Sequence, residues 1–176
     1  MINKHDINYD DVTISRLGPE RYADFRVLRL ESLKAFSEAF GSSYEEESSF
    51  FDEVWKARIA NMLFALYKTT LIGMIGFLPR GRVKTRHVAD IFSFYVREKY
   101  QGAGVGSRLM EGALLNIESN REIRKITLSV NCDMEAAVHL YKKFGFAISG
   151  RLIRELNVNG KFYDEFIMEK LVKTPS

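Results

Sequence analysis

A glycine-rich segment between a strand pattern and a helix pattern constrains the fold of this chain more than any other feature. Residues 88–96 are rich in β-branched and aromatic side chains, which predicts a strand. Apolar residues recur at helical spacing from Val105 onward, which predicts a helix. At the junction, Gly102, Gly104 and Gly106 leave backbone N–H groups unshielded at a helix N-terminus. Such groups favour an anion such as a diphosphate, although a plain turn that uses glycine for its geometry has the same pattern.

Two common phosphate-binding loops do not fit this segment. A dinucleotide fingerprint that began at Gly102 would need a glycine at position 107, where the chain has Ser107. A P-loop would end in Gly-Lys-Ser/Thr, whereas Gly106 is followed by Ser107 and Arg108. The sequence therefore excludes both motifs.

The pattern that fits is Gln101-x-x-Gly104-x-Gly106 after a Tyr-Val strand end. It resembles the acetyl-coenzyme A (acetyl-CoA) loop of the GNAT superfamily of N-acetyltransferases, whose motif is Arg/Gln-x-x-Gly-x-Gly/Ala. A second segment, Leu140-Tyr141-Lys142-Lys143-Phe144-Gly145-Phe146, resembles the family's Leu-Tyr-x-Lys-x-Gly-Phe and follows the loop at the family's spacing. One position departs from the family: many members have an asparagine seven residues before the tyrosine, where this chain has Met134.

This resemblance implies that acetyl-CoA binds along the strand end and the loop. The backbone N–H of Val96, or a neighbour, would face the thioester oxygen. Asn131 is the nearest asparagine to the family position, and whether it replaces the missing contact stays open. The cofactor contacts that the resemblance implies are Phe94, Tyr95, Val96, Gln101, Gly102, Ala103, Gly104, Val105, Gly106, Ser107, Asn131 and Tyr141.

The order of predicted elements gives an α/β fold class. We expect one domain over residues 1–176, with flexible tails at 1–10 and 173–176. Its centre should be a mixed, mostly antiparallel sheet of about seven strands, with about four helices on its two faces. The predicted strands are 12–17, 62–67, 71–78, 88–96, 125–130, 146–156 and 162–171, the last two joined by an Asn159-Gly160 turn. The predicted helices are most of 19–40, with a break expected before Phe40, then 49–60, the segment after the glycine loop and 134–144, with a loop over 41–47.

Composition excludes several other classes of protein. The 26 basic and 23 acidic residues give a net charge of +3, which is too balanced to indicate a nucleic-acid partner. The longest apolar run, residues 71–78, is too short for a membrane span. The single cysteine, Cys132, excludes an internal disulfide framework and fits a cytoplasmic location. No histidine pair has the spacing of a metal site, so no metal is expected.

Two residues are candidates for catalysis. Tyr141 lies on the apolar stripe of its predicted helix, and the resemblance implies that its hydroxyl protonates the departing thiolate. A backbone carbonyl is the alternative partner for a hydroxyl that serves only the core. Asp90 interrupts an apolar strand, a setting that would raise the pKa of a carboxylate and suit a general base. A strand-end aspartate bonded to a loop, or a relay through water, are the alternatives for Asp90.

The resemblance implies an enzyme that transfers the acetyl group of acetyl-CoA to a primary amine by direct attack in a ternary complex. The acceptor is left open among a small amine, a polyamine, an amino acid and a peptide or protein amine. Glu45, Glu46 and Glu47 could attract a cationic acceptor, or could simply form a solvated acidic loop. The alternatives to an enzyme are a CoA-binding regulatory or interaction module without turnover and a partner-binding domain. Family members are often homodimers, which makes the C-terminal hairpin a candidate interface.

Overall fold

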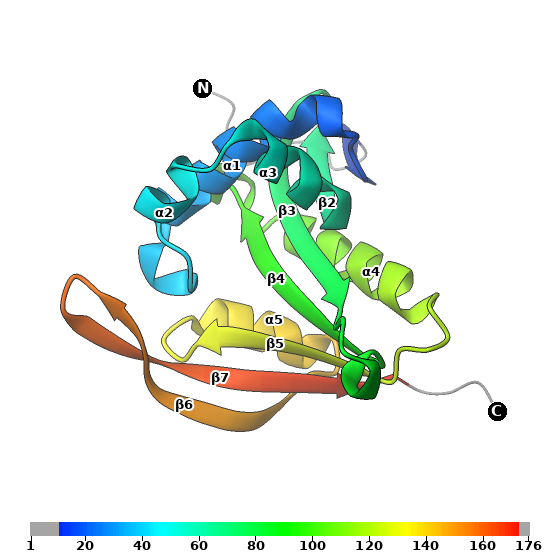
Figure 1. The fold of residues 1–176 in the computed structure, drawn as a ribbon, viewed down its shortest axis with the longest axis vertical. Helices are drawn as coiled ribbons and strands as arrows, with labels where there is room; N and C mark the ends of the chain where they lie inside the picture. The colour runs from blue at the N-terminus through cyan, green and yellow to red at the C-terminus, as the bar shows by residue number, and fades with distance from the viewer. Residues whose placement is uncertain (1–10, 173–176) are drawn as a thin grey trace.

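The computed structural model describes residues 11–172, so both expected tails lie outside the described residues. Seven strands form one sheet in the order β1-β2-β3-β4-β5-β7-β6, and only the β4–β5 pair is parallel (Figure 1). This confirms the predicted mixed, mostly antiparallel α/β fold. The strands are β1 Val12–Ser15, β2 Met62–Tyr67, β3 Thr70–Pro79, β4 Val88–Val96, β5 Lys125–Asn131, β6 Ala147–Val158 and β7 Lys161–Leu171.

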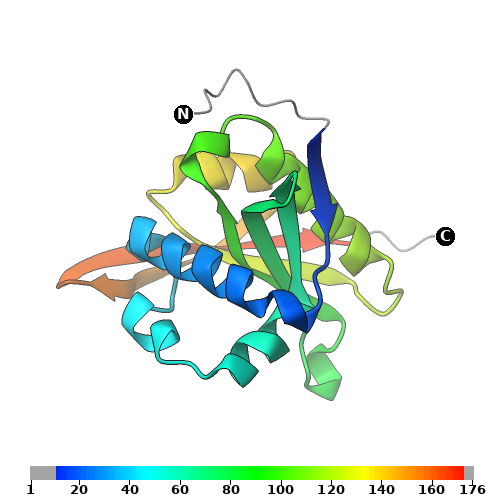
Figure 2. The same ribbon diagram turned by 90° about the horizontal axis from the view of Figure 1, so that it is seen from above.

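Helices cover both faces of the sheet (Figure 2). One face carries α1, α2 and α3, and the other carries α4 and α5. Side chains of β2 point alternately to the two faces, so that Phe64 packs in the core under α1 and α3 while Leu63 packs in the core under α4. The helices are α1 Tyr22–Ala35, α2 Tyr44–Ser48, α3 Asp52–Arg58, α4 Val105–Glu118 and α5 Glu135–Lys143.

The N-terminal half matches one prediction and departs from another. Residues 19–40 are mostly helical, as expected, and consist of a 3₁₀ turn, α1 and a second 3₁₀ turn at Ser37–Ala39; the break before Phe40 falls at Phe36, where the backbone leaves helical geometry with φ −138° and ψ 61°. The loop expected over 41–47 contains the short helix α2. The Ser43 side chain caps this helix by accepting a hydrogen bond from the Glu46 N–H at 3.1 Å.

The feature of the sheet that creates the site is the separation of β4 from β5. The two strands pair over only three positions, from Val88 with Lys125 to Asp90 with Thr127. Beyond them β4 bulges where Ser93 adopts a left-handed φ of 52°, and the pairing of β4 with β3 shifts register. Gly76 on β3 is required there, because a Cβ at this position would lie 2.3 Å from the Phe92 ring. The outer halves of β4 and β5 therefore diverge, as Figure 1 shows.

A buried ion-pair cluster holds the three N-terminal helices together. The Glu47 carboxylate on α2 accepts hydrogen bonds from Arg29 on α1 at 2.8 and 3.0 Å and from Arg58 on α3 at 3.1 Å. The Glu47 residue is 1% exposed. Burial alone would raise the pKa of Glu47, but the two guanidinium groups outweigh it and lower that pKa. The expectation of three exposed carboxylates in this segment is therefore wrong for Glu47, while Glu45 and Glu46 are exposed.

We predict that Glu47→Gln lowers the free energy of unfolding by about 3–5 kcal/mol, because it leaves buried guanidinium charge without a partner. Since the pKa of Glu47 is lowered in the folded state, its stabilisation is present above the ordinary glutamate pKa and is lost as the pH falls through the lowered value. Urea denaturation at pH 7 measures the difference. Glu45→Gln, two residues earlier in the same helix and exposed, is the matched control. Equal stability of the two variants at pH 7 would contradict the prediction.

Candidate active site

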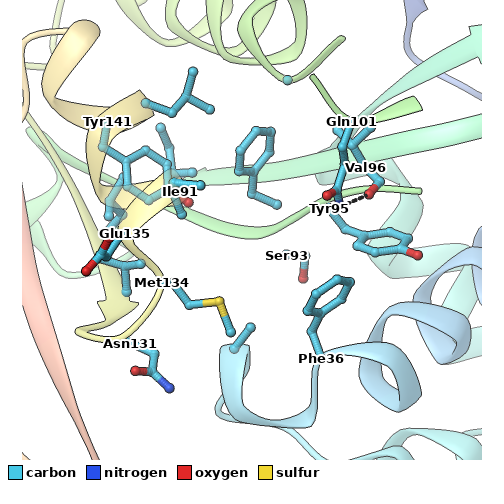
Figure 3. Close-up of a pocket in the computed structure, with 18 of the residues that line it drawn as sticks. Phe36, Ile91, Ser93, Tyr95, Val96, Gln101, Asn131, Met134, Glu135 and Tyr141 are labelled. Atoms are coloured by element: carbon cyan, nitrogen blue, oxygen red, sulfur yellow. Dashed lines mark hydrogen bonds between the residues drawn. The ribbon is translucent and has the colours of Figure 1, made fainter. Parts of the chain in front are cut away.

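A pocket of about 1010 Å³ opens where β4 and β5 diverge. Its walls come from the outer half of β4, the glycine loop, the end of β5 and the helix α5 (Figure 3). Ten of the twelve expected cofactor residues line it. The other two do not: Val105 is 1% exposed because its side chain packs in the core, and Ala103 is absent from the wall of the pocket.

The glycine loop gives this pocket an open backbone cradle. Gly102 and Gly104 both have a φ of 78°, which other residues adopt only with strain. No atom lies within 4 Å of where their Cβ atoms would be, so this space is free for a ligand. Gly104 is the N-cap of α4, whose first N–H groups have no acceptor within the helix. The loop therefore fits the diphosphate of a coenzyme A molecule.

Side chains fix the loop to the end of β4. The Gln101 Nε2 donates a hydrogen bond to the Val96 carbonyl at 2.8 Å, shown as a dashed line in Figure 3. The Phe94 ring packs against Gly106, where a Cβ would lie 3.3 Å from its Cζ. Tyr95 instead packs with Phe36 in the core under the N-terminal helices, and its hydroxyl donates to Glu31 at 3.1 Å. Phe36 lines the same pocket, so the Tyr95 ring helps to hold this part of the wall in place.

Tyr141 lies deep in the wall of the pocket. Its ring contacts the rings of Phe94 and Phe146, with centroids 6.0 and 6.1 Å apart, and the residue is 6% exposed. Burial raises the pKa of Tyr141 above its ordinary value, so the hydroxyl keeps its proton at neutral pH. The hydroxyl makes no hydrogen bond to any of the described residues 11–172. The backbone carbonyl that was the alternative partner is thus not found within that part of the chain.

Asn131 has a structural task at the same pocket. Its Nδ2 donates to the Glu38 carbonyl at 2.9 Å, and its Oδ1 accepts from the Asp133 N–H at 2.9 Å. These bonds tie the 3₁₀ turn after α1 to the end of β5. Met134, at the family's asparagine position, also lines the pocket (Figure 3). Whether Asn131 contacts a cofactor stays a prediction.

A second pocket, of about 550 Å³, lies on the face of the sheet that carries the N-terminal helices. It shares seven wall residues with the first pocket, so the two meet along the gap between β4 and β5. The shared residues are Ala39, Phe40, Ile91, Phe92, Ser93, Leu128 and Ser129. Neither Glu45 nor Glu46 lines either pocket.

Asp90 lines the second pocket rather than the first. Both of its oxygens accept hydrogen bonds from Arg80, at 2.8 to 3.2 Å, and its side chain is 41% exposed. This is close to the alternative of a strand-end aspartate bonded to a neighbouring loop. A role of Asp90 as general base remains a prediction, and its carboxylate would first have to leave Arg80.

Of the charged residues that line the second pocket, the sequence analysis named only Asp90; it missed Arg29, Arg58, Arg80, Lys125, Glu165 and Glu169. A glutamate that interrupts an apolar strand was a signal available for Glu165, as it was for Asp90. The signal had no meaning without the pairing of β7 with β5, which brings Glu165 opposite Asn131. Arg29 and Arg58 resembled ordinary helix-surface cations in the sequence.

Within residues 11–172, no group of three or more potential ligands could hold a metal ion. No helix in the same range has the length and apolar character needed to cross a membrane.

Comparison with known proteins identifies the family of this chain. The sequence profile of the Acetyltransferase (GNAT) family matches residues 28–146. The L-amino acid N-acetyltransferase AaaT of Escherichia coli K12 is 28% identical over 125 residues, which cover 68% of this chain and 76% of that protein. The spermidine N(1)-acetyltransferase of the same organism is 31% identical over 71 residues, which cover 40% of this chain and 38% of that enzyme.

Solved structures agree with this assignment. A GNAT-family acetyltransferase from Streptococcus pneumoniae has a TM-score of 0.77 at 25% identity, over 92% of this chain and 99% of that one. The acetyl-CoA complex of yncA from Salmonella typhimurium also has a TM-score of 0.77, at 15% identity, over 94% and 96% of the two chains, and shares the fold. The chain described here belongs to the acetyltransferase (GNAT) family.

Proposed function

We propose that this protein transfers the acetyl group of acetyl-CoA to the primary amine of a small acceptor, by direct attack in a ternary complex. The observation that carries the proposal is the gap between β4 and β5, which joins a glycine cradle on one side to a charged pocket on the other. A donor and an acceptor bound on the two sides would meet in this gap. The acetyltransferase relatives support the same reaction.

The residues of the first pocket have separable tasks in this reaction. The backbone N–H groups at the start of α4 hold the diphosphate. Acetyl-CoA supplies an activated acyl group whose thiolate leaves. Tyr141 holds the proton that the departing sulfur needs, because its hydroxyl is free and burial raises its pKa.

Among acceptors, we favour an amino acid over a polyamine. We take the second pocket as the acceptor pocket, because it meets the first along the gap from the opposite face of the sheet. Arg29 and Arg58 both line it and share one carboxylate, Glu47, so this cluster keeps one positive charge. A positive wall suits an acceptor that carries a carboxylate and disfavours a polycation. The inward position of Glu47 also removes one of three carboxylates that would attract a polyamine. The amino-acid acetyltransferase of Escherichia coli supports this choice, since its match covers more of this chain than that of the spermidine enzyme.

A thiol-release assay tests the function and the acceptor together. The purified protein is incubated with acetyl-CoA and either the twenty amino acids or spermidine and spermine, and product masses are measured. We expect free CoA and an N-acetyl product with at least one amino acid, at a higher kcat/KM than with either polyamine. Release with polyamines alone would overturn the acceptor choice. CoA binding without release from any amine would instead support a regulatory module.

The loop assignment leads to a second prediction. Gly104→Glu should weaken CoA binding by roughly 100-fold, because its carboxylate would occupy the place of the diphosphate and repel it. Gly104→Ala carries the same backbone strain at a φ of 78° without the charge, and is the matched control. Calorimetry measures both affinities. Equal affinities in the two folded variants would show that the diphosphate lies elsewhere.

The acid role of Tyr141 gives a third prediction. Tyr141→Phe keeps the ring and removes the hydroxyl, so kcat should fall at least ~10-fold while CoA affinity changes little. Tyr67→Phe, whose ring packs against Tyr100 outside both pockets, is the control. Steady-state rates and calorimetry supply the two readouts. A wild-type kcat in Tyr141→Phe, with chemistry rate-limiting, would restrict Tyr141 to a packing role.

A further inference from the structure

We propose that Glu165 is the general base that takes the proton of the acceptor amine. The inference rests on the proposed acetyl transfer and adds a residue to it. Glu165 lies on β7, in the wall of the acceptor pocket, at a position that no motif of the sequence indicated.

The first observation is a carboxylate without a partner, on a residue that is almost wholly buried. Glu165 is 9% exposed and has no hydrogen bond or ion pair with any residue in the described range 11–172. Its carboxylate oxygens are not fully buried, so the charged end of the side chain reaches the second pocket, where a ligand could bind it. The pocket already contains cations, but none of them reaches Glu165.

Each of those cations forms an ion pair with a carboxylate other than Glu165. Arg80 pairs with Asp90 at 2.8 Å, and Lys125 pairs with Glu169 at 2.8 Å. Arg29 and Arg58 pair with Glu47. Among the carboxylates that line the second pocket, Glu165 is therefore the one without a cation partner, and it is open to an incoming ammonium or amine.

The second observation is the place of Glu165 relative to the gap. Its Cα is paired with that of Asn131 on β5, and Asn131 lines the first pocket. Neighbouring strands lie about 4.8 Å apart, so β7 is one strand spacing behind the edge of β5 that borders the gap. Ile167 and Glu169, which alternate with the core residues of β7, line the same pocket and show that this face of the strand points into it.

The electrostatic surroundings favour proton uptake. Burial raises the pKa of Glu165, and the nearby Glu155 carboxylate on β6 raises it further. A higher pKa makes a carboxylate a stronger base, and efficiency is best when it approaches the working pH. The other titratable or charged groups around the pocket are Arg29, Arg58, Arg80, Asp90, Lys125 and Glu169, with Cys132 at the end of β5.

The proposed step balances. The lone pair of the amine nitrogen forms a bond to the acetyl carbon, and the carbon–sulfur bond breaks with its electron pair on sulfur. The proton lost by nitrogen goes to a carboxylate oxygen of Glu165, and Tyr141 gives its proton to sulfur. The products are the N-acetyl acceptor and CoA thiol. Solvent then takes the proton from Glu165 and returns one to Tyr141.

The test compares Glu165→Gln with the wild type over a pH range, using whichever amine the wild type acetylates. We expect kcat/KM for the amine to fall about 10²–10⁴-fold, as for loss of a general base, with CoA affinity by calorimetry unchanged. The wild-type rate should fall as the pH drops through the pKa of Glu165, because a protonated carboxylate accepts no proton. That acidic decline should be missing in Glu165→Gln.

Two further variants keep the result specific. Glu155→Gln removes the nearby charge, so the acidic decline should move to lower pH. Glu122→Gln, exposed and remote from both pockets, should match the wild type.

Three other outcomes would overturn either the base role of Glu165 or the proposed function. A raised KM with kcat and the acidic decline unchanged in Glu165→Gln would overturn the base role. Loss of the acidic decline in Asp90→Asn, with Glu165→Gln unaffected, would overturn it in favour of Asp90. A wild type that turns over no amine would instead remove the proposed function on which the inference rests.

Discussion

The site of this protein depends on how early the backbone pairing between β4 and β5 stops. β4 and β5 form a parallel ladder for three residue pairs and then separate, since β4 bulges at Ser93. Unpaired strand groups in the middle of a sheet are costly unless something else binds them. The gap therefore leaves strand groups open to a ligand. Both pockets, and the residues that they share, follow from this interruption.

Other contacts hold the N-terminal helices and the end of β5 in place around the gap. The Arg29–Glu47–Arg58 cluster fixes α1, α2 and α3 relative to one another above β2 and β3. Asn131 bridges from β5 to the Glu38 carbonyl in the 3₁₀ turn after α1. The N-terminal helices thus form a fixed wall across the open end of the sheet. Arg29 and Arg58 on these helices line the second pocket.

The sequence predicted the features that depend on residues close together in the chain, such as strands and turns. Alternation and apolar runs located all seven strands, and Asn159 and Gly160, with φ of 52° and 84°, form the expected hairpin turn. The loop before α4 was predicted because its glycines leave backbone N–H groups unshielded at a helix N-terminus. The bulge at Ser93 was not predictable, because serine in a strand gives no signal for a left-handed φ. Nor were the inward turn of Glu47 and the isolation of Glu165, which depend on partners 11 to 18 residues away in one case and on strand pairing in the other.

The two pockets enter the gap from opposite faces of the sheet, one beside α5 and the other beneath α1 and α3. A molecule bound on one face leaves the entrance on the other face free. Neither substrate would have to depart before the other arrives, and a spent donor could be exchanged while the acetylated acceptor is still in place. A compound that joined both halves would have to thread its linker between two strands. That route is lined by the residues that both pockets share, Phe40, Phe92 and Ser93 among them, so a bisubstrate inhibitor would need a thin, unbranched connection.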